Sequence, residues 1–177
     1  MSLPLPDGWL PANDDPARPI MTLSTTAPDA RTVMLSEVDD DGFYFHTDTR
    51  SRKIEQLAAD PRVALTLVWP ELRRQLVVLG TAELAPAVEQ DRAYRNRSPY
   101  LKQLAWQNTV ELAQLPTDDR RAIWASFEPP IHPPETWIGY LVRPHRITVW
   151  EGASDAASRR TEHTLVDGAW VSEYLAG

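Results

Sequence analysis

A short basic cluster follows an apolar segment in the first third of the sequence. Ser51, Arg52 and Lys53 come soon after the segment 43–47, and Arg31 opens the apolar segment before that. A helix that begins at Ser51 would present free backbone amides and the positive end of its dipole at one place. Two cations in a first helical turn are unfavourable there unless an anion lies close by. The pattern therefore indicates an anion site, and a phosphate group is the simplest occupant.

A second interpretation of this cluster is structural. A solvated helix end with basic surface residues would give the same local pattern, and a short motif by itself does not separate the two. The distinction depends on what the rest of the chain places near Lys53.

The bulk composition excludes several classes of protein. The chain has 177 residues, 42% of them hydrophobic, with a net charge of −7, which is ordinary for a globular domain and argues against a general nucleic-acid binder. It has no cysteine, and its four histidines (His46, His132, His145 and His163) show no spacing typical of a metal site. No apolar run is long enough for a bilayer and no signal-peptide pattern is present, so we expect no membrane association and a cytoplasmic location.

The periodicity of the sequence predicts mostly strands. Residues 1–19 are rich in Pro and Asp and are expected to form an irregular arm that ends in a short helical turn. Predicted strands cover 20–26, 31–38, 43–47, 62–69, 73–84, 137–142 and 146–150, the last two on either side of a turn at Pro144, and a terminal hairpin turns at Asp167-Gly168. Predicted helices cover 51–59, 87–97, 100–107 and 118–127.

Two local features qualify this pattern. Ser51 is expected to cap the first helix through its side chain, and Gly80 is expected to mark a bulge or bend in its strand. Five strands within about 65 residues, joined by short turns, predict a closed or sandwiched antiparallel sheet in one domain, with the helices outside it. Trp137, Trp150 and Trp170 are core residues by default, unless a planar cofactor lies against them.

Five segments together resemble one known family. They are Arg31–Leu35, Phe43–Lys53, Trp69–Gln75, Trp137–Tyr140 and, after Pro144, Arg146–Gly152. Their order and spacing resemble the pyridoxamine 5′-phosphate oxidase family of FMN-binding split barrels, over residues 20–176. The resemblance implies a mainly β fold with added helices: a six-stranded antiparallel barrel of Greek-key type with peripheral helices. It implies one domain over residues 1–177, in which residues 137–177 supply strands for a homodimer.

The resemblance also implies that FMN binds at the interface between two subunits. The cations of the basic cluster would neutralise its phosphate, backbone groups of the 31–34 strand would meet the isoalloxazine, and Trp150 and Arg160 would come from the partner subunit. His46 stands where the family has Tyr. The residues implied at the cofactor are Arg31, Thr32, Val33, Met34, His46, Thr47, Ser51, Arg52, Lys53, Gln75, Gln107, Asn108, Trp150 and Arg160.

The substrate side departs from the family pattern. A family Lys is replaced by Ser36, a family Arg aligns with Ser98 beside Arg97, and a family Arg-x-His segment reads Ala-Ala-Ser ending at Ser158. Each charge-assisted bond to a phosphate contributes about 1.5–3 kcal/mol, so we expect a substrate other than pyridoxine 5′-phosphate. The candidate substrate contacts are Ser36, Tyr94, Arg97 and Ser158.

The resulting hypothesis is an FMN-dependent oxidoreductase that takes a hydride from a small heteroaromatic or amine substrate, with no side chain acting as the nucleophile. Three alternatives stay open at this point. They are a flavin reductase or an enzyme that uses a nicotinamide or deazaflavin donor, a non-catalytic FMN-binding protein, and a structural dimer that has lost FMN.

Overall fold

A computed structural model describes residues 2–177, so residue 1 of the predicted arm lies outside it. The strands of this region form one antiparallel sheet that curls around an apolar core. They are β1 (Ile20–Thr25), β2 (Asp29–Met34), β3 (Glu37–Asp39), β4 (Gly42–Asp48), β5 (Arg62–Trp69), β6 (Arg74–Leu84), β7 (Trp137–Glu151), β8 (Arg159–Val166) and β9 (Ala169–Ala176). The hydrogen-bonded order is β2-β1-β5-β6-β7-β4-β3, with β8 and β9 added beside β7.

The sheet is a barrel with a split. Its two ends are β2 and the β3–β4 hairpin, which lie against each other without forming a ladder. The predicted mainly β split-barrel architecture is therefore confirmed. Burial alternates along β1 and β5, because successive side chains of a strand point to opposite faces. The inner faces supply fully buried residues such as Leu23, Phe45, Leu65, Leu76 and Ile147.

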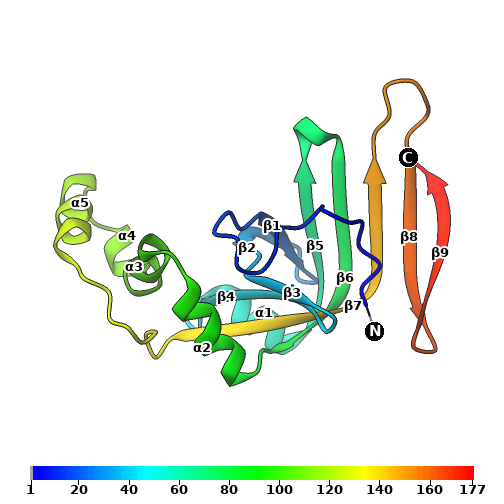
Figure 1. Ribbon diagram of the computed structural model, residues 1–177. Helices are drawn as coiled ribbons and strands as arrows, with labels where there is room; N and C mark the ends of the chain where they lie inside the picture. The colour runs from blue at the N-terminus through cyan, green and yellow to red at the C-terminus, as the bar shows by residue number, and fades with distance from the viewer. Residues whose placement is uncertain (1) are drawn as a thin grey trace.

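The helices lie outside this sheet. They are α1 (Arg52–Ala59), α2 (Ala87–Asn96), α3 (Pro99–Gln107), α4 (Val110–Ala113) and α5 (Thr117–Ser126), with a 3-10 turn at Pro70–Leu72. Figure 1 shows α3, α4 and α5 grouped at one end of the molecule and the β8–β9 hairpin at the other end. No helix of the described residues is both long and apolar enough to cross a membrane.

The arm formed by residues 2–19 is irregular, as predicted. It contains single hydrogen-bonded turns, such as the one closed by Asp15 N and Ala12 O at 3.0 Å, and no helix. Trp9, 8% exposed, packs edge-on against Trp69 with ring centroids 5.9 Å apart. The guanidinium of Arg74 lies 5.0 Å from the Trp9 ring. The arm therefore contributes an aromatic side chain to the core that the strands enclose.

Two strand predictions were wrong, and both errors have a physical cause. The segment 31–38 is not one strand, because Leu35 and Ser36 leave the ladder: the Leu35 amide donates to Pro19 O and the Ser36 amide to Tyr44 O. The predicted turn at Pro144 is absent, because β7 runs through it without interruption. A register shift between Leu79 and Gly80 lies opposite Pro144, so the bulge accommodates a residue that has no amide hydrogen to donate.

Ser51 occupies the N-cap position of α1, as predicted, but its side chain makes no capping hydrogen bond. Its hydroxyl accepts a hydrogen bond from the Lys53 ammonium instead, at 2.5 Å. The expected cap is thus replaced by a contact that fixes a cation at the start of the helix.

Gly42 is the most constrained turn residue of the sheet. Its φ is +149°, and an added Cβ would lie 2.1 Å from the Val142 carbonyl oxygen. We expect Gly42→Ala to lower the free energy of unfolding by more than about 3 kcal/mol, measured by urea denaturation, because backbone must move to relieve the overlap. Gly168→Ala is the matched control: its φ is +78° with nothing within 4 Å of the new Cβ, so the loss should stay near about 1–2 kcal/mol. Equal losses would contradict the steric explanation.

Candidate functional site

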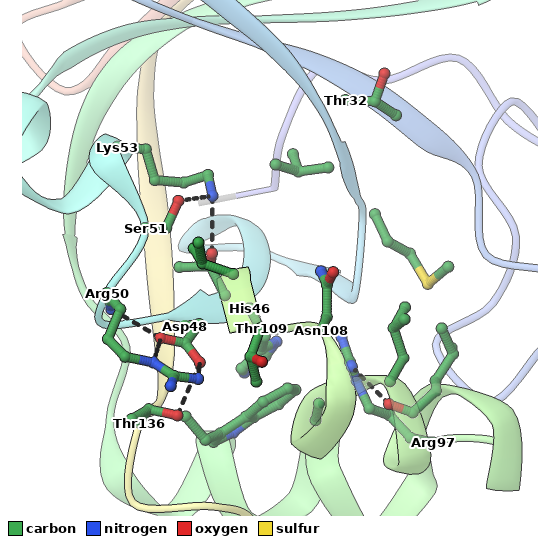
Figure 2. A pocket seen from close by; sticks show the side chains of 18 of the residues that line it. Thr32, His46, Asp48, Arg50, Ser51, Lys53, Arg97, Asn108, Thr109 and Thr136 are labelled. Atoms are coloured by element: carbon green, nitrogen blue, oxygen red, sulfur yellow. Dashed lines mark hydrogen bonds and ion pairs between the residues drawn. The ribbon is translucent and has the colours of Figure 1, made fainter. Parts of the chain in front are cut away.

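Of two adjoining cavities, the larger has a volume of about 550 Å³ and lies beside the split of the barrel. Strands β2 and β4 and the start of α1 form one side, and α3 with the loop after it forms the other (Figure 2). The lining residues are Thr32, Val33, Met34, His46, Thr47, Asp48, Arg50, Ser51, Lys53, Arg97, Leu101, Leu104, Ala105, Asn108, Thr109, Val110, Glu111, Thr136 and Trp137.

Lys53 is one of three cations that line this cavity, together with Arg50 and Arg97. Its Nζ donates to Thr47 Oγ1 at 2.9 Å and to Ser51 Oγ at 2.5 Å (Figure 2). Among residues 2–177 no carboxylate lies within ion-pair distance of it. Burial lowers the pKa of Lys53, the Arg31 charge lowers it further, and Asp48 opposes both. A desolvated ammonium held by neutral hydroxyls is a site that favours an anion.

Arg31 and Arg52 stand beside this cavity without lining it. Arg31 lies 2.8 Å from Asp29 Oδ2 and donates to Gln56 Oε1 at 2.5 Å, while the largely exposed Arg52 lies 3.4 Å from the same carboxylate. The Gln56 hydrogen bond, followed by these two charges, lowers the pKa of Asp29. The two arginines therefore add positive potential at the end of α1, and the Asp29 carboxylate orients both.

The same wall carries a second polar group. Asp48 accepts from Arg50 at 2.7 Å and from the Thr136 hydroxyl at 2.8 Å, and Figure 2 shows the three side chains together. The hydrogen bonds from Arg50 are the largest cause that holds the pKa of Asp48 at about 2. This anion and its cation neutralise each other, which leaves Lys53 as the net charge of the wall.

An aromatic stack joins this wall to the helices. The imidazole of His46 stacks on the Trp137 ring with centroids 4.8 Å apart and an interplanar angle of 9°. The Arg97 guanidinium lies 4.2 Å from the centroid of the same ring. Burial lowers the pKa of Arg97 to about 10, and its hydrogen bond is to Leu101 O at 3.3 Å. Trp137 thus separates a buried imidazole from a buried guanidinium.

A second cavity of about 340 Å³ adjoins the first, and both are lined by Met34, Arg97 and Leu101. Ser36 and Arg18 line only the second. Burial lowers the pKa of Arg18, and its Nη2 is buried without a hydrogen-bond partner among the described residues. The shared wall makes the second cavity a natural place for a molecule that reacts with an occupant of the first.

His46 connects the two cavities through a partly buried chain of polar groups. Its Nδ1 lies 2.8 Å from Ser36 Oγ, and its Nε2 lies 3.3 Å from Glu89 Oε2. The His46 and Glu89 side chains are 0% and 4% exposed. Nε2 and both Glu89 oxygens form no hydrogen bond with any described residue, so the two groups lie close together without an aligned hydrogen bond.

The structure brings together some of the predicted site residues and separates others. Thr32, Val33, Met34, His46, Thr47, Ser51, Lys53, Asn108 and Arg97 share the larger cavity, and Ser36 lines the smaller one. Gln75, Trp150 and Arg160 are cross-strand neighbours in β6, β7 and β8, outside both cavities. These assignments stay predictions.

Three predicted residues are occupied elsewhere. Gln107 faces α5 and donates to Ile123 O at 3.3 Å. Tyr94 is fully buried, donates to Pro130 O at 3.1 Å and accepts from Trp106 Nε1 at 3.0 Å. The carbonyl of Ser158 accepts from the Gly177 amide. None of the three lines either cavity.

Sequence reasoning also missed residues that the site uses. Trp137 was assigned to the core by default, yet it lines the larger cavity. Asp48 follows the Phe43–Thr47 motif directly and could have been found from that position. Glu89 is 43 positions from His46 and lies in the first turn of α2, where an acidic residue is expected for the helix dipole alone; no local signal marks it.

Comparison with known proteins gives a consistent family. Residues 16–128 match the family model described as pyridoxamine 5′-phosphate oxidase. A pyridoxine/pyridoxamine 5′-phosphate oxidase from Pseudomonas savastanoi pv. phaseolicola is 36% identical over 170 residues, covering 88% of this chain and 77% of the relative. The enzyme of the same name from Actinobacillus pleuropneumoniae serotype 5b is 34% identical, covering 93% of this chain and 81% of its own.

Solved structures share the fold at lower sequence identity. PhzG from Burkholderia lata, solved with tetrahydrophenazine-1-carboxylic acid, has a TM-score of 0.68 and 22% identity, with coverage of 92% of this chain and 83% of its own. A pyridoxamine 5′-phosphate oxidase-related, FMN-binding protein from Nostoc punctiforme has a TM-score of 0.64 and 20% identity, with coverage of 89% and 88%. At these identities the similarity concerns the split-barrel fold.

The wall at Asp48 predicts a pH-dependent stability. The pKa of Asp48 is about 2 in the folded protein, below its ordinary value of 3.8, so its contribution is complete above the ordinary value and is lost as the pH falls towards about 2. We expect Asp48→Asn to lower the unfolding free energy by roughly 1 kcal/mol at neutral pH, after allowance for solvent screening. The difference in unfolding free energy between the variant and the parent, measured by urea denaturation, should vanish near pH 2, which is the pKa of Asp48 in the folded protein. A difference that does not depend on pH would contradict this origin.

Proposed function

The chain belongs to the pyridoxamine 5′-phosphate oxidase family, and we propose that it is an FMN-dependent oxidoreductase with a substrate pocket of its own. In this proposal residues 1–177 form one domain that acts as a cytoplasmic homodimer, and the substrate is a small heteroaromatic or amine compound. The observation that carries the proposal is the Lys53 ammonium, which is partly desolvated, held by two hydroxyls, and free of a carboxylate partner among the described residues.

The larger cavity suits the phosphate of FMN. An anion at Lys53 would replace lost hydration with charge-assisted bonds, while Thr47 and Ser51 already point to the same spot and can donate to a phosphate oxygen. Arg31 and Arg52 add positive potential from behind Asp29. A cavity of about 550 Å³ lies within the range of about 300–1,000 Å³ that is usual for cofactor sites.

The edge of the sheet suits the flavin ring. Strand β2 pairs with β1 on one side and is the end of the hydrogen-bonded order, so the backbone groups on its other side are available to a ligand. Thr32, Val33 and Met34 of this strand line the cavity. The ring would lie along that edge with its polar atoms toward these groups, as the resemblance implies.

A second copy of the chain would complete the site. Trp137 and Trp150 lie on the same strand, 13 positions apart, which is about 40 Å along an extended chain. One FMN bound at Lys53 therefore does not reach Trp150 of its own subunit. Gln75 is the direct cross-strand partner of Trp150, and Arg160 is its partner on the other side. If Trp150 comes from the partner subunit, Gln75 and Arg160 come with it.

The exposed terminal hairpin supports the same arrangement. β8 and β9 pair only with β7 and with each other, and Val166, Val171 and Tyr174 are between 47% and 68% exposed. A two-stranded extension with apolar residues on its surface is marginally stable unless something covers it. In the proposed dimer, residues 137–177 supply the strands of the interface.

Bound FMN would supply the chemistry, by accepting a hydride from the substrate. The protein would hold the ring at the β2 edge, close the larger cavity with α3, and receive the substrate in the adjoining cavity. Arg18 and Arg97 are the cations there, and Asp14, Asp15 and Glu37 line the same cavity. Because the lining carries charge of both signs, it suits an amine or a heteroaromatic substrate with charged substituents better than a neutral aliphatic one.

The phosphate assignment predicts a specific loss of affinity. We expect Lys53→Ala to weaken FMN binding at least about tenfold, from the loss of one charge-assisted bond, and the combined Arg52→Ala and Lys53→Ala change to abolish tight binding. Affinity is measured by quenching of flavin fluorescence on titration. Riboflavin, which lacks the phosphate, should bind the parent and Lys53→Ala equally. Arg62→Ala, which removes an exposed arginine paired with Asp60, is the control. A double variant that purifies as yellow as the parent would contradict the assignment of the phosphate site to Lys53.

The substrate pocket predicts a preference. Because Ser36 replaces a family lysine, we expect the FMN-loaded protein to oxidise pyridoxine 5′-phosphate at a small fraction of the rate of a family oxidase, roughly 10-fold or more slower from the loss of one charged contact. The measurement is formation of pyridoxal 5′-phosphate under air, with one of the curated relatives assayed beside it. Turnover equal to that of the relative would contradict the inference from the missing cation.

A further inference from the structure

We propose that Ser36, His46 and Glu89 form a buried proton relay that takes a proton from the substrate during its oxidation. The proposal rests on the proposed function for the oxidant, which is the flavin. It adds what the flavin does not supply, namely a group on the protein that accepts the proton released when a C–H bond next to an O–H or N–H group is oxidised. The three side chains are contiguous, since 2.8 Å separates Ser36 Oγ from His46 Nδ1 and 3.3 Å separates His46 Nε2 from Glu89 Oε2.

The position of Glu89 selects the tautomer of His46. A carboxylate beside Nε2 favours a hydrogen on that nitrogen, and this leaves Nδ1 as an acceptor. The only group bonded to Nδ1 among the described residues is the Ser36 hydroxyl, which then donates to it. The remaining lone pairs of Ser36 Oγ are free to accept a hydrogen bond from a molecule in the smaller cavity, which Ser36 lines.

This geometry permits a balanced step. The O–H or N–H proton of the substrate passes to Ser36 Oγ, and the Ser36 proton passes to His46 Nδ1. Bound FMN would accept the hydride from the substrate C–H bond, so the substrate would gain a C=O or C=N bond and lose two electrons. The imidazolium formed at His46 is stabilised by the Glu89 carboxylate, whose oxygens have no other partner among the described residues.

Neighbouring contacts hold the relay in place. Glu37, next to Ser36, makes a bidentate ion pair with Arg92, one helical turn from Glu89 in α2, and so ties the β3 side of the relay to the helix. Gln90 fixes the start of α2 through bonds to the Ala85 carbonyl and the Gly139 amide, at 2.7 Å and 3.0 Å. At Gly139 an added Cβ would lie 2.8 Å from His46 Nε2, so the absence of a side chain there makes room for the imidazole.

The relay has an isolated counterpart in the same chain. His163 Nδ1 lies 2.7 Å from Ser172 Oγ on the exposed β8–β9 hairpin, and among the described residues no carboxylate pairs with it. The two Ser–His pairs thus share one contact and differ in the carboxylate and in the adjacent cavity. Ser172→Ala is therefore a control matched to Ser36→Ala.

The first test reads the histidine directly and needs neither flavin nor substrate. The full-length protein is labelled with ¹⁵N-histidine, and the ring of His46 is assigned by its loss in His46→Asn. At the pH of the activity assay, we expect a neutral ring with hydrogen on Nε2. In Glu89→Gln the amide can donate to Nε2, so hydrogen should move to Nδ1. A parent ring that carries hydrogen on Nδ1, or on both nitrogens, could not accept the Ser36 proton and would overturn the relay.

The second test reads the chemistry. The holoprotein is mixed without oxygen with saturating pyridoxamine 5′-phosphate or pyridoxine 5′-phosphate, and bleaching of the flavin is followed in a single turnover, so slow donors still give a ratio. We expect Ser36→Ala to slow bleaching about 100-fold or more, with the donor Kd changed only severalfold, and Ser36→Thr to retain most of the rate. Ser172→Ala should match the parent. Bleaching by Ser36→Ala at the parent rate would refute the relay, whereas failure to bind FMN would refute the proposed function and leave the tautomer result standing.

Discussion

The structure depends on a cation that the protein itself does not neutralise. Lys53 is drawn toward two hydroxyls at the start of α1, where burial lowers its pKa and where the helix dipole disfavours positive charge. Folding therefore places a charge in an unfavourable location and leaves its compensation to a ligand. The chain as a whole carries a charge of −7, so the local positive potential is built by position and not by composition. The unpaired ammonium lowers the stability of the folded protein, and an anionic cofactor that binds it would raise that stability again.

The other charged groups near Lys53 are paired with partners other than Lys53. Asp29 holds Arg31 and Arg52 behind the cavity, and Arg50 with Thr136 holds Asp48 on the β4 wall. Asp29 and Asp48 are thus each matched by their own donors. Arg97 is different, because its partners are a carbonyl oxygen and the face of Trp137. A guanidinium that rests on an indole stays charged without a counter-ion, and so it can face a substrate without being cancelled by the protein.

The sequence was sufficient for most of the fold and for the half of the site that is local. Alternating burial in β1, β5 and β6 follows directly from period-two patterns, and Thr47, Ser51 and Lys53 lie within seven residues of one another, so one strand-to-helix junction brings them together. The errors came from tertiary context. The break at Leu35 and Ser36 arises because those amides bond to Pro19 and Tyr44. Strand β7 passes Pro144 because the register shifts opposite Leu79 and Gly80, where His145 of β7 has no partner in β6. The Ser36–His46–Glu89 contact arises from the packing of three separate segments. It could not be predicted from the spacing of these residues along the chain.

Two departures from the family pattern, at Ser36 and His46, concern side chains that contact each other in the structure. The resemblance places Ser36 where relatives carry a lysine and His46 where they carry a tyrosine, and as separate substitutions the first removes a cation while the second appears tolerated. In the structure the two side chains are hydrogen-bonded to each other. A lysine at position 36 would put an ammonium against Nδ1, and a tyrosine at position 46 would have to share the space between Glu89 and Gly139 that the smaller imidazole fills. Under the proposed function, the pair would exchange phosphate recognition for a polar chain that ends at a buried carboxylate, which is the change expected if the cofactor site is retained and the substrate is new.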